Sequence, residues 1–300
     1  MAFKKRGIDV KFVLNRTSEP TTFAASGNGS NVVTLTGLRV TANIRQAAPP
    51  EGTSASLRIF GVSLSVMNDL SSLGKSKYQE NYSTHITVSA GNAGAAKPVV
   101  FVGNVSQAWV DGGSQPDVAL VVQAFTGLVD NVKPLPPTSF PGPANVADII
   151  SGLAVQMGYT FENNGVSVIL NDQYLPGTGR AQVQRAADAA GIRWDVIDNV
   201  LSIWPRGGSR NSDIPLVGPT SGMVGYPSYT QDGCMIVSTY NPAIRRGGQI
   251  KVESSFTPAQ GVWPVTLVEH DLESETPGGA WMTRASCSFF GSPAPFTPGV

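Results

Sequence analysis

The stretch 145–204 contains one pattern twice: an amphipathic helix, a glycine and a hairpin. In the first copy, apolar residues recur at i, i+3, i+4, i+7, i+8 and i+11, the spacing of one helix face: they are Val146, Ile149, Ile150, Leu153, Ala154 and Met157. Gly158 follows, and glycine is the usual left-handed stop of a helix. Strands over 159–162 and 166–170 flank Asn164-Gly165, the strongest short hairpin signal.

The second copy follows the same plan with a less apolar helix. Its stripe is made of Val183, Ala186, Ala187 and Ala190, and Gly191 is the predicted stop. Strands over 193–197 and 200–204 are expected to pair around Asp198-Asn199. Two such units, with β sequence on both sides and nothing that resembles a reaction centre, favour a ring-building scaffold.

Short alternating segments fill the sequence on both sides of this repeat. Before it, five or six strands and one helix over 63–73 are typical of a small antiparallel barrel or sandwich; a change of phase at Gly37 predicts a β-bulge. After it, strands are expected over 233–239, 249–256, 261–271 and 281–289. The predicted fold class is therefore mainly β with an α+β insertion: two small, barrel-like β domains that flank a doubled helix–hairpin α/β domain.

Two changes in composition set the expected domain boundaries. Five prolines between residues 132 and 143 predict a stiff linker, and a Gly/Ser/Arg stretch over 206–212 marks the second boundary. The predicted organisation is a first β domain (1–131), a Pro-rich linker (132–144), the α/β domain (145–207), a second β domain (208–291) and a C-terminal tail (292–300).

Bulk composition excludes several classes of protein. Lys+Arg and Asp+Glu both number 21, so no global field draws the chain to nucleic acid or to a membrane. No apolar run is long enough to span a bilayer, and charged residues interrupt the N-terminal run, so neither a membrane anchor nor a signal peptide is expected. Cys234 and Cys287 lack the spacing of a zinc site. Two buried thiols are the favoured state, with a disulfide between them left open.

Candidate catalytic residues are few. His85 is interpreted as an exposed residue within a strand, and His270 as a residue at a solvated strand end. Two histidines cannot build the usual His-rich metal site. The carboxylates of the repeat carry no catalytic motif, so turn and cap roles are expected for them: they are Glu162, Asp172, Asp188, Asp195 and Asp198. No catalytic, cofactor-binding or metal-binding residue is predicted, and the chain is not expected to be an enzyme.

Two further groups are interpreted structurally. Arg245-Arg246, which precede two glycines, are expected at an exposed hairpin tip, with an acidic binding partner as the alternative. All five tryptophans fall in predicted strands and are expected to pack in the core, although aromatic residues are also enriched at interfaces. The five are Trp109, Trp194, Trp204, Trp263 and Trp281.

Taken over its length, the chain resembles the baseplate hub proteins of long-tailed bacteriophages, of the Mu and late-control types, and their relatives at the base of type VI secretion spikes. The resemblance rests on the repeat and on later runs; these include Gly222-Met223-Val224-Gly225-Tyr226-Pro227, Tyr240-Asn241-Pro242-Ala243-Ile244, Gly247-Gly248-Gln249-Ile250, His270-Asp271-Leu272 and Gly278-Gly279-Ala280-Trp281. At the front, Ile86 to Gly91 and Val100-Phe101-Val102-Gly103-Asn104-Val105 look like strands of the family's first barrel.

This resemblance implies a homotrimer in which each subunit supplies two tube-like domains, so that a threefold ring imitates sixfold symmetry. The implied partners are a tail tube or tube-proximal baseplate protein, the central spike protein and the tape measure protein, with DNA only as passing cargo. The implied location is the virion tail baseplate, after synthesis in the host cytoplasm. The alternatives are a receptor- or glycan-binding tail protein and a cell-wall hydrolase.

Overall fold

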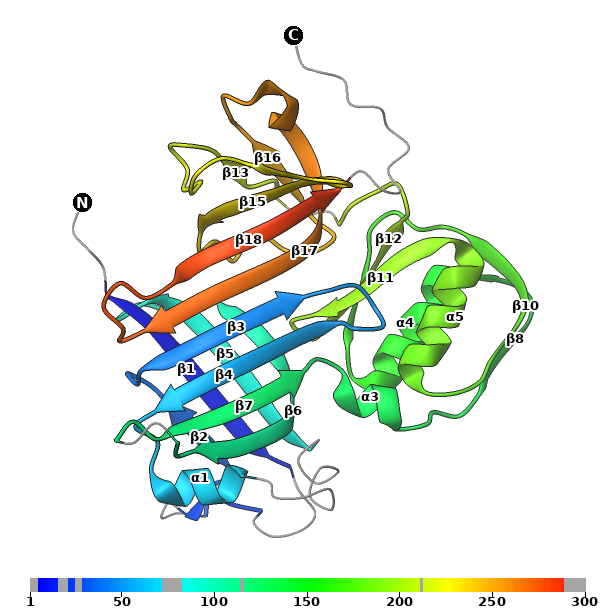
Figure 1. Ribbon diagram of the computed structural model, residues 1–300. Helices are drawn as coiled ribbons and strands as arrows, with labels where there is room; N and C mark the ends of the chain where they lie inside the picture. Colours follow the sequence, from blue (N-terminus) through cyan, green and yellow to red (C-terminus); the bar gives the residue numbers. More distant parts are fainter. Residues whose placement is uncertain are drawn as a thin grey trace. The chain divides into compact units, whose positions relative to one another are not determined.

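The computed structural model describes residues 5–15, 21–24, 29–71, 83–113, 116–210 and 213–288 (Figure 1). The chain is mainly β, as the sequence predicts. It divides into two compact units, of which the first comprises Met1–Arg45, Thr53–Val129 and Glu269–Met282. The second comprises Gln46–Gly52, Asp130–Val268 and Thr283–Val300. The predicted tail over 292–300 lies outside the described residues.

The first unit is built from short strands that pair in the hydrogen-bonded order β3-β4-β7-β6-β5-β1-β2. Their bounds are β1 Arg6–Leu14, β2 Val32–Leu35, β3 Val40–Gln46, β4 Thr53–Phe60, β5 Thr84–Asn92, β6 Val99–Asp111 and β7 Ala119–Phe125. Helix α1 (Leu64–Leu70) is capped by Ser63, whose side chain accepts a hydrogen bond from the backbone of Val66. The strands alternate buried and exposed residues, which is the pattern of a sheet with one face on a core.

The predicted bulge at Gly37 is instead the end of a strand. Gly37 has a φ of 67°, a backbone conformation that glycine adopts without strain, and it lies between β2 and β3. β2 pairs with β1, whereas β3 pairs with β4, so the change of phase marks a change of partner. Within the described part of the chain, no strand pairing closes the sheet into a barrel.

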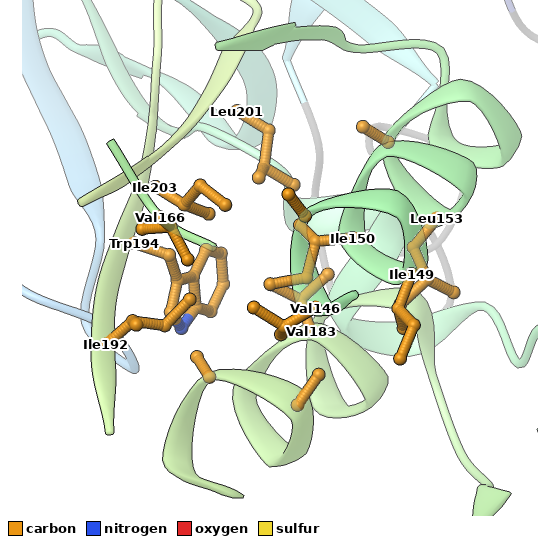
Figure 2. Packing of buried hydrophobic residues seen from close by; sticks show 14 of the residues in the cluster. Val146, Ile149, Ile150, Leu153, Val166, Val183, Ile192, Trp194, Leu201 and Ile203 are labelled. Carbon is orange, nitrogen blue, oxygen red and sulfur yellow. The ribbon is translucent and has the colours of Figure 1, made fainter. Parts of the chain in front are cut away.

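Both predicted helices of the repeat are present in the second unit. Helix α4 (Val146–Met157) is capped by Asn145, and α5 (Gly179–Ala190) is capped by Thr178. Each ends at the predicted glycine, Gly158 with a φ of 79° and Gly191 with a φ of 65°. The apolar stripes of the two helices pack against the strands in one core (Figure 2). Local spacing and glycine placement therefore predicted both helices correctly.

The second predicted hairpin is confirmed. Strands β11 (Ile192–Ile197) and β12 (Val200–Pro205) pair antiparallel. Asp198 and Asn199, which join them, have positive φ angles of 52° and 65°. Such angles are those of a tight type I′ turn, whose twist matches that of the strands it joins.

The first predicted hairpin is wrong. β9 (Thr160–Asn163) pairs in parallel with β12, and β10 (Ile169–Leu175) pairs antiparallel with β8 (Thr138–Asn145). Asn164-Gly165 does form a bend, but the buried Asn164 side chain donates a hydrogen bond to the carbonyl oxygen of Ile203, 3.2 Å away on β12. This contact directs β9 to β12, so the two strands beside the bend have different partners.

Part of the Pro-rich stretch also forms a strand. β8 covers residues 138–145, and all but the last of these lie in the stretch 132–144 that was predicted to be a linker. Proline is tolerated in edge strands because they need not donate every backbone N–H. β8 pairs with β10 alone, and its register shifts between Asn171 and Gln173 of β10. An edge position and an irregular register therefore accommodate the prolines.

The remaining strands contain the second predicted β segment. Their order is β14-β15-β18-β17, with β16 paired to both β17 and β13. Their bounds are β13 Leu216–Val217, β14 Ser228–Thr230, β15 Gly233–Thr239, β16 Gln249–Val252, β17 Gly261–Ser274 and β18 Trp281–Ser288. Cys234 and Cys287 are buried free thiols in the core of this sheet. Among the described residues, no helix has the length and hydropathy needed to cross a bilayer.

Candidate functional site

The histidines do not form a site. His85 is exposed on β5, as expected, whereas His270 is 1% exposed on β17. The predicted solvated strand end at His270 is wrong because β17 continues to Ser274, and His270 therefore shares the buried face with Val268 and Leu272. No cluster of metal-ligating side chains is found in the part of the chain that the structure describes.

The five carboxylates of the repeat separate into two groups. Asp172 and Asp188 are exposed and bond to neutral groups: Asp172 Oδ1 accepts a hydrogen bond from the Gly142 backbone at 2.7 Å, and Asp188 Oδ1 accepts one from Gln184 at 2.8 Å. Each of the other three is paired with an arginine from the segment after the repeat. Their pairs are Glu162–Arg210, Asp195–Arg246 and Asp198–Arg245.

The central pair, Asp195–Arg246, is buried. The side chains of Asp195 and Arg246 are 0% and 6% exposed. Asp195 Oδ1 also accepts a hydrogen bond from the Val196 backbone at 2.8 Å, and the Arg246 backbone donates one to Gln46 Oε1 at 3.1 Å. Arg246 is thus no exposed hairpin tip, and its acidic partner belongs to the same chain. The cost of burying both charges is offset only because they are paired and hydrogen-bonded.

The two outer pairs are more accessible. Arg210 Nη2 lies 3.0 Å from Glu162 Oε2, and Arg245 Nη2 lies 3.1 Å from Asp198 Oδ2. Burial raises the pKa of Glu162, but hydrogen bonds from Arg210 and other neighbours outweigh it, and the net pKa is lowered. For Asp198, burial dominates over the arginine charges and raises the pKa.

An aromatic ring and a glycine complete the cluster. Trp204 is 2% exposed, and the guanidinium carbon of Arg246 lies 5.9 Å from the centre of its ring. Gly247 packs so closely that a Cβ there would lie 2.7 Å from Trp204 Cζ2. The Gly247 carbonyl accepts a hydrogen bond from the Arg210 backbone at 2.7 Å. Burial and the nearby charges of Arg246 and Arg206 lower the pKa of Arg193.

This arginine cluster, made of Arg193, Arg206, Arg210, Arg245 and Arg246, links the helix–hairpin region to the segment that follows it. Each of its three carboxylates is held by one arginine. The arrangement fixes structure. Sequence analysis missed these pairings; one signal was available in Asp195, which stands between Trp194 and Val196 in a predicted strand.

A separate feature of the second unit is a group of exposed aromatic side chains. Tyr226 and Phe256 are 66% and 47% exposed, and their rings meet edge to face at 5.1 Å. Tyr229 is 57% exposed on β14, the strand that ends the hydrogen-bonded order. Exposed aromatic side chains are typical of surfaces that contact other proteins.

The same fold occurs in solved structures of phage tail proteins. A tail protein from Neisseria meningitidis MC58 superposes with a TM-score of 0.61 at 11% identity, covering 95% of this chain and 96% of that chain. The 43 kDa tail protein of prophage MuSo2 from Shewanella oneidensis gives 0.59 at 9% identity, covering 95% and 96%. A chain of the Francisella PdpA–VgrG complex gives 0.51 at 6% identity, covering 98% and 60%. No curated protein sequence matches significantly.

The chain therefore shares its fold with proteins of phage tails. More narrowly, the chain belongs to the baseplate hub gp41 family, whose sequence pattern it matches over residues 21–279. The resemblance to baseplate hub proteins seen in the sequence is therefore confirmed. Membership of this family implies that the chain is a component of the virion tail.

Proposed function

We propose that the chain is the hub of a phage baseplate and assembles as a homotrimeric ring between the sixfold tail tube and the threefold central spike. In this ring the β segments 1–131 and 208–291 take equivalent, tube-like positions, and the α/β region 145–207 is the spacer between them. DNA passes through the centre during ejection, and the chain itself catalyses no reaction. The tape measure protein is a further partner.

The observation that carries the proposal is the family match over residues 21–279. The strand pattern agrees with it, because the described chain contains antiparallel β structure both before and after the helix–hairpin region. Strands β2 and β14 end the hydrogen-bonded order, and their outer edges offer backbone donors and acceptors to a neighbouring subunit. Three copies arranged around an axis would give each such edge a partner.

The arginine cluster is consistent with a structural protein that keeps one shape in an assembly. Its three ion pairs tie residues 162–198 to residues 210–246, and the central pair is shielded from salt and water. Ion pairs of this kind would keep the shape of the second unit fixed in such a ring.

The test is the mass and shape of the purified chain in solution. Light scattering over a dilution series should show a particle of three times the 31.4 kDa chain mass that dissociates on dilution. Electron micrographs should show a ring with a central hole. A strictly monomeric protein at high concentration would refute the hub assignment.

The alternatives give different results in the same preparation. A receptor- or glycan-binding protein would bind host cells saturably as an isolated chain. A cell-wall hydrolase would clear a zymogram, and because Glu162, Asp195 and Asp198 are held by arginines, its activity would depend on exposed Asp172 or Asp188. Asp172→Asn and Asp188→Asn should therefore both leave a hub unchanged, whereas one of the two should inactivate such an enzyme.

A further inference from the structure

Two thiols lie side by side in the core of the second unit. Cys234 is on β15 and Cys287 is on β18, and these strands are neighbours in the sheet. Both belong to the same hydrophobic cluster and are 0% and 1% exposed. We propose that Cys234 and Cys287, which are free thiols in this structure, form a disulfide bond with each other once the protein leaves a reducing compartment. The oxidant is a small-molecule disulfide.

The register of the strands brings the two cysteines opposite each other. At one end, Gly233 lies against the end of β18, since a Cβ on Gly233 would lie 3.0 Å from Ser288 Cα. At the other end, the Asn241 backbone donates a hydrogen bond to Thr283 Oγ1 at 3.1 Å. Residue numbers therefore rise along β15 as they fall along β18, which is an antiparallel register. The position after Gly233 then lies beside the position before Ser288.

Opposite residues of an antiparallel pair suit a disulfide. Their Cα atoms are about 4.5–5.5 Å apart, and disulfides span Cα separations of about 4.4–6.8 Å. Bond formation between Cys234 and Cys287 thus needs rotation of the side chains and no movement of the strands. Both side chains already point to the same core, beside Ile236 and Ala285.

The chemical environment makes the two thiols unequal. The hydrogen bond between them lowers the pKa of Cys234, whereas the same bond and burial raise the pKa of Cys287. The thiol of lower pKa is the better source of thiolate. Cys234 is accordingly the attacking group and Cys287 the resolving group.

The reaction balances with glutathione disulfide as the oxidant. The Cys234 thiolate attacks one sulfur of glutathione disulfide, forms a mixed disulfide and releases one glutathione thiolate. The Cys287 thiolate then attacks the Cys234 sulfur and displaces the second glutathione. Two protein thiols are oxidised and one glutathione disulfide is reduced to two glutathiones, whose thiolates take up the two protons that the protein thiols lose through solvent.

Burial determines when the bond can form. Neither thiol is accessible in the folded chain, so the oxidant reaches Cys234 only when the edge of the sheet opens locally. Once formed, the bond closes a loop of roughly fifty residues that contains β15 to β18 and restricts the unfolded chain. For a phage particle released from the host cytoplasm, this would strengthen the second unit after assembly; that consequence alone rests on the proposed function.

The experiment uses the full chain equilibrated in glutathione redox buffers. After an acid quench, thiols are alkylated in denaturant and counted by intact mass, and a non-reducing digest identifies linked peptides. The wild type should lose both alkylation sites together and yield a peptide joining Cys234 to Cys287. Its melting temperature should rise by about 5–10 °C relative to the reduced chain.

Cys234→Ser and Cys287→Ser are the matched controls. Cys234→Ser should keep its one alkylation site, whereas Cys287→Ser can go no further than the mixed disulfide of Cys234 with glutathione, seen as the added mass of one glutathione. Neither variant should give a linked peptide within the chain or the rise in melting temperature of the wild type. The proposal is overturned if the wild type keeps both thiols, forms only disulfides between chains, or shows a melting shift that the single variants share. The oligomeric state is measured separately, so failure of the hub proposal would not affect this result.

Discussion

Removal of the carboxylate at Asp195 tests whether the arginine cluster holds the second unit together. In Asp195→Asn the shape is kept, but the Arg246 guanidinium is left without an opposite charge at a site where its side chain is 6% exposed. Breaking one partner of a buried pair costs about 3–5 kcal/mol. Because the asparagine oxygen can still accept one hydrogen bond, we expect a loss of about 3 kcal/mol, the lower end of that range.

The assay is urea unfolding followed by tryptophan fluorescence. Trp194 and Trp204 are 4% and 2% exposed in this part of the chain, so their emission reports its unfolding. Arg246→Met should cost a similar amount, because it strands the Asp195 carboxylate. The double variant should cost less than the two single variants together, with a coupling of about 2 kcal/mol.

Lys251→Met provides the matched control. Lys251 and Glu253 also form an ion pair, but it is long, at 3.9 Å, and its side chains are 57% and 45% exposed. An exposed pair of this kind contributes about 0–1 kcal/mol. If Asp195→Asn were as mild as Lys251→Met, or if the effects of Asp195→Asn and Arg246→Met simply added, the cluster would not stabilise the fold in the way described.

Three further predictions concern single positions. Gly247→Ala should lower the free energy of unfolding by about 2–4 kcal/mol, since its Cβ would meet Trp204 and its φ is 78°; a melting temperature equal to wild type would contradict this. Gly191→Ala, at a helix end with a φ of 65° and nothing within 4 Å of the new Cβ, should cost only about 1 kcal/mol in the same measurement. Glu162 has a pKa lowered from its ordinary 4.5, so its stabilisation is complete above pH 4.5 and fades as the pH falls through the lowered value. Urea unfolding at several pH values should therefore show the stability of Glu162→Gln approaching that of wild type in acid, and a constant difference would contradict the assignment.

The sequence was informative where structure depends on neighbours along the chain. The stripes that begin at Val146 and Val183, and the glycines at 158 and 191, defined both helices because helix faces and caps are set within a few residues. The Asp198-Asn199 turn was predicted for the same reason. The bend at Asn164-Gly165 was also predicted correctly, but the strands on its two sides were wrongly expected to pair with each other.

Errors arose where the outcome depended on distant contacts. Turn chemistry specifies a change of direction and not the strand that pairs next, so nothing local assigned β9 to β12. Charge was treated as a mark of solvent exposure, which failed at Arg246 because Asp195, 51 positions away, supplies its counter-charge. His270 was placed at a strand end because its strand was ended too early, although it alternates in step with Val268 and Leu272.

The ion pairs also determine how this chain can be cut into pieces. A fragment that stops near residue 207 keeps Asp195 and Asp198 but loses the arginines that pair with them. The complementary fragment keeps Arg245 and Arg246 without their carboxylates. Neither piece would be expected to survive alone, while mixing the two could restore the missing charges. The first fragment must also include Gln46, because its side chain accepts a hydrogen bond from the Arg246 backbone.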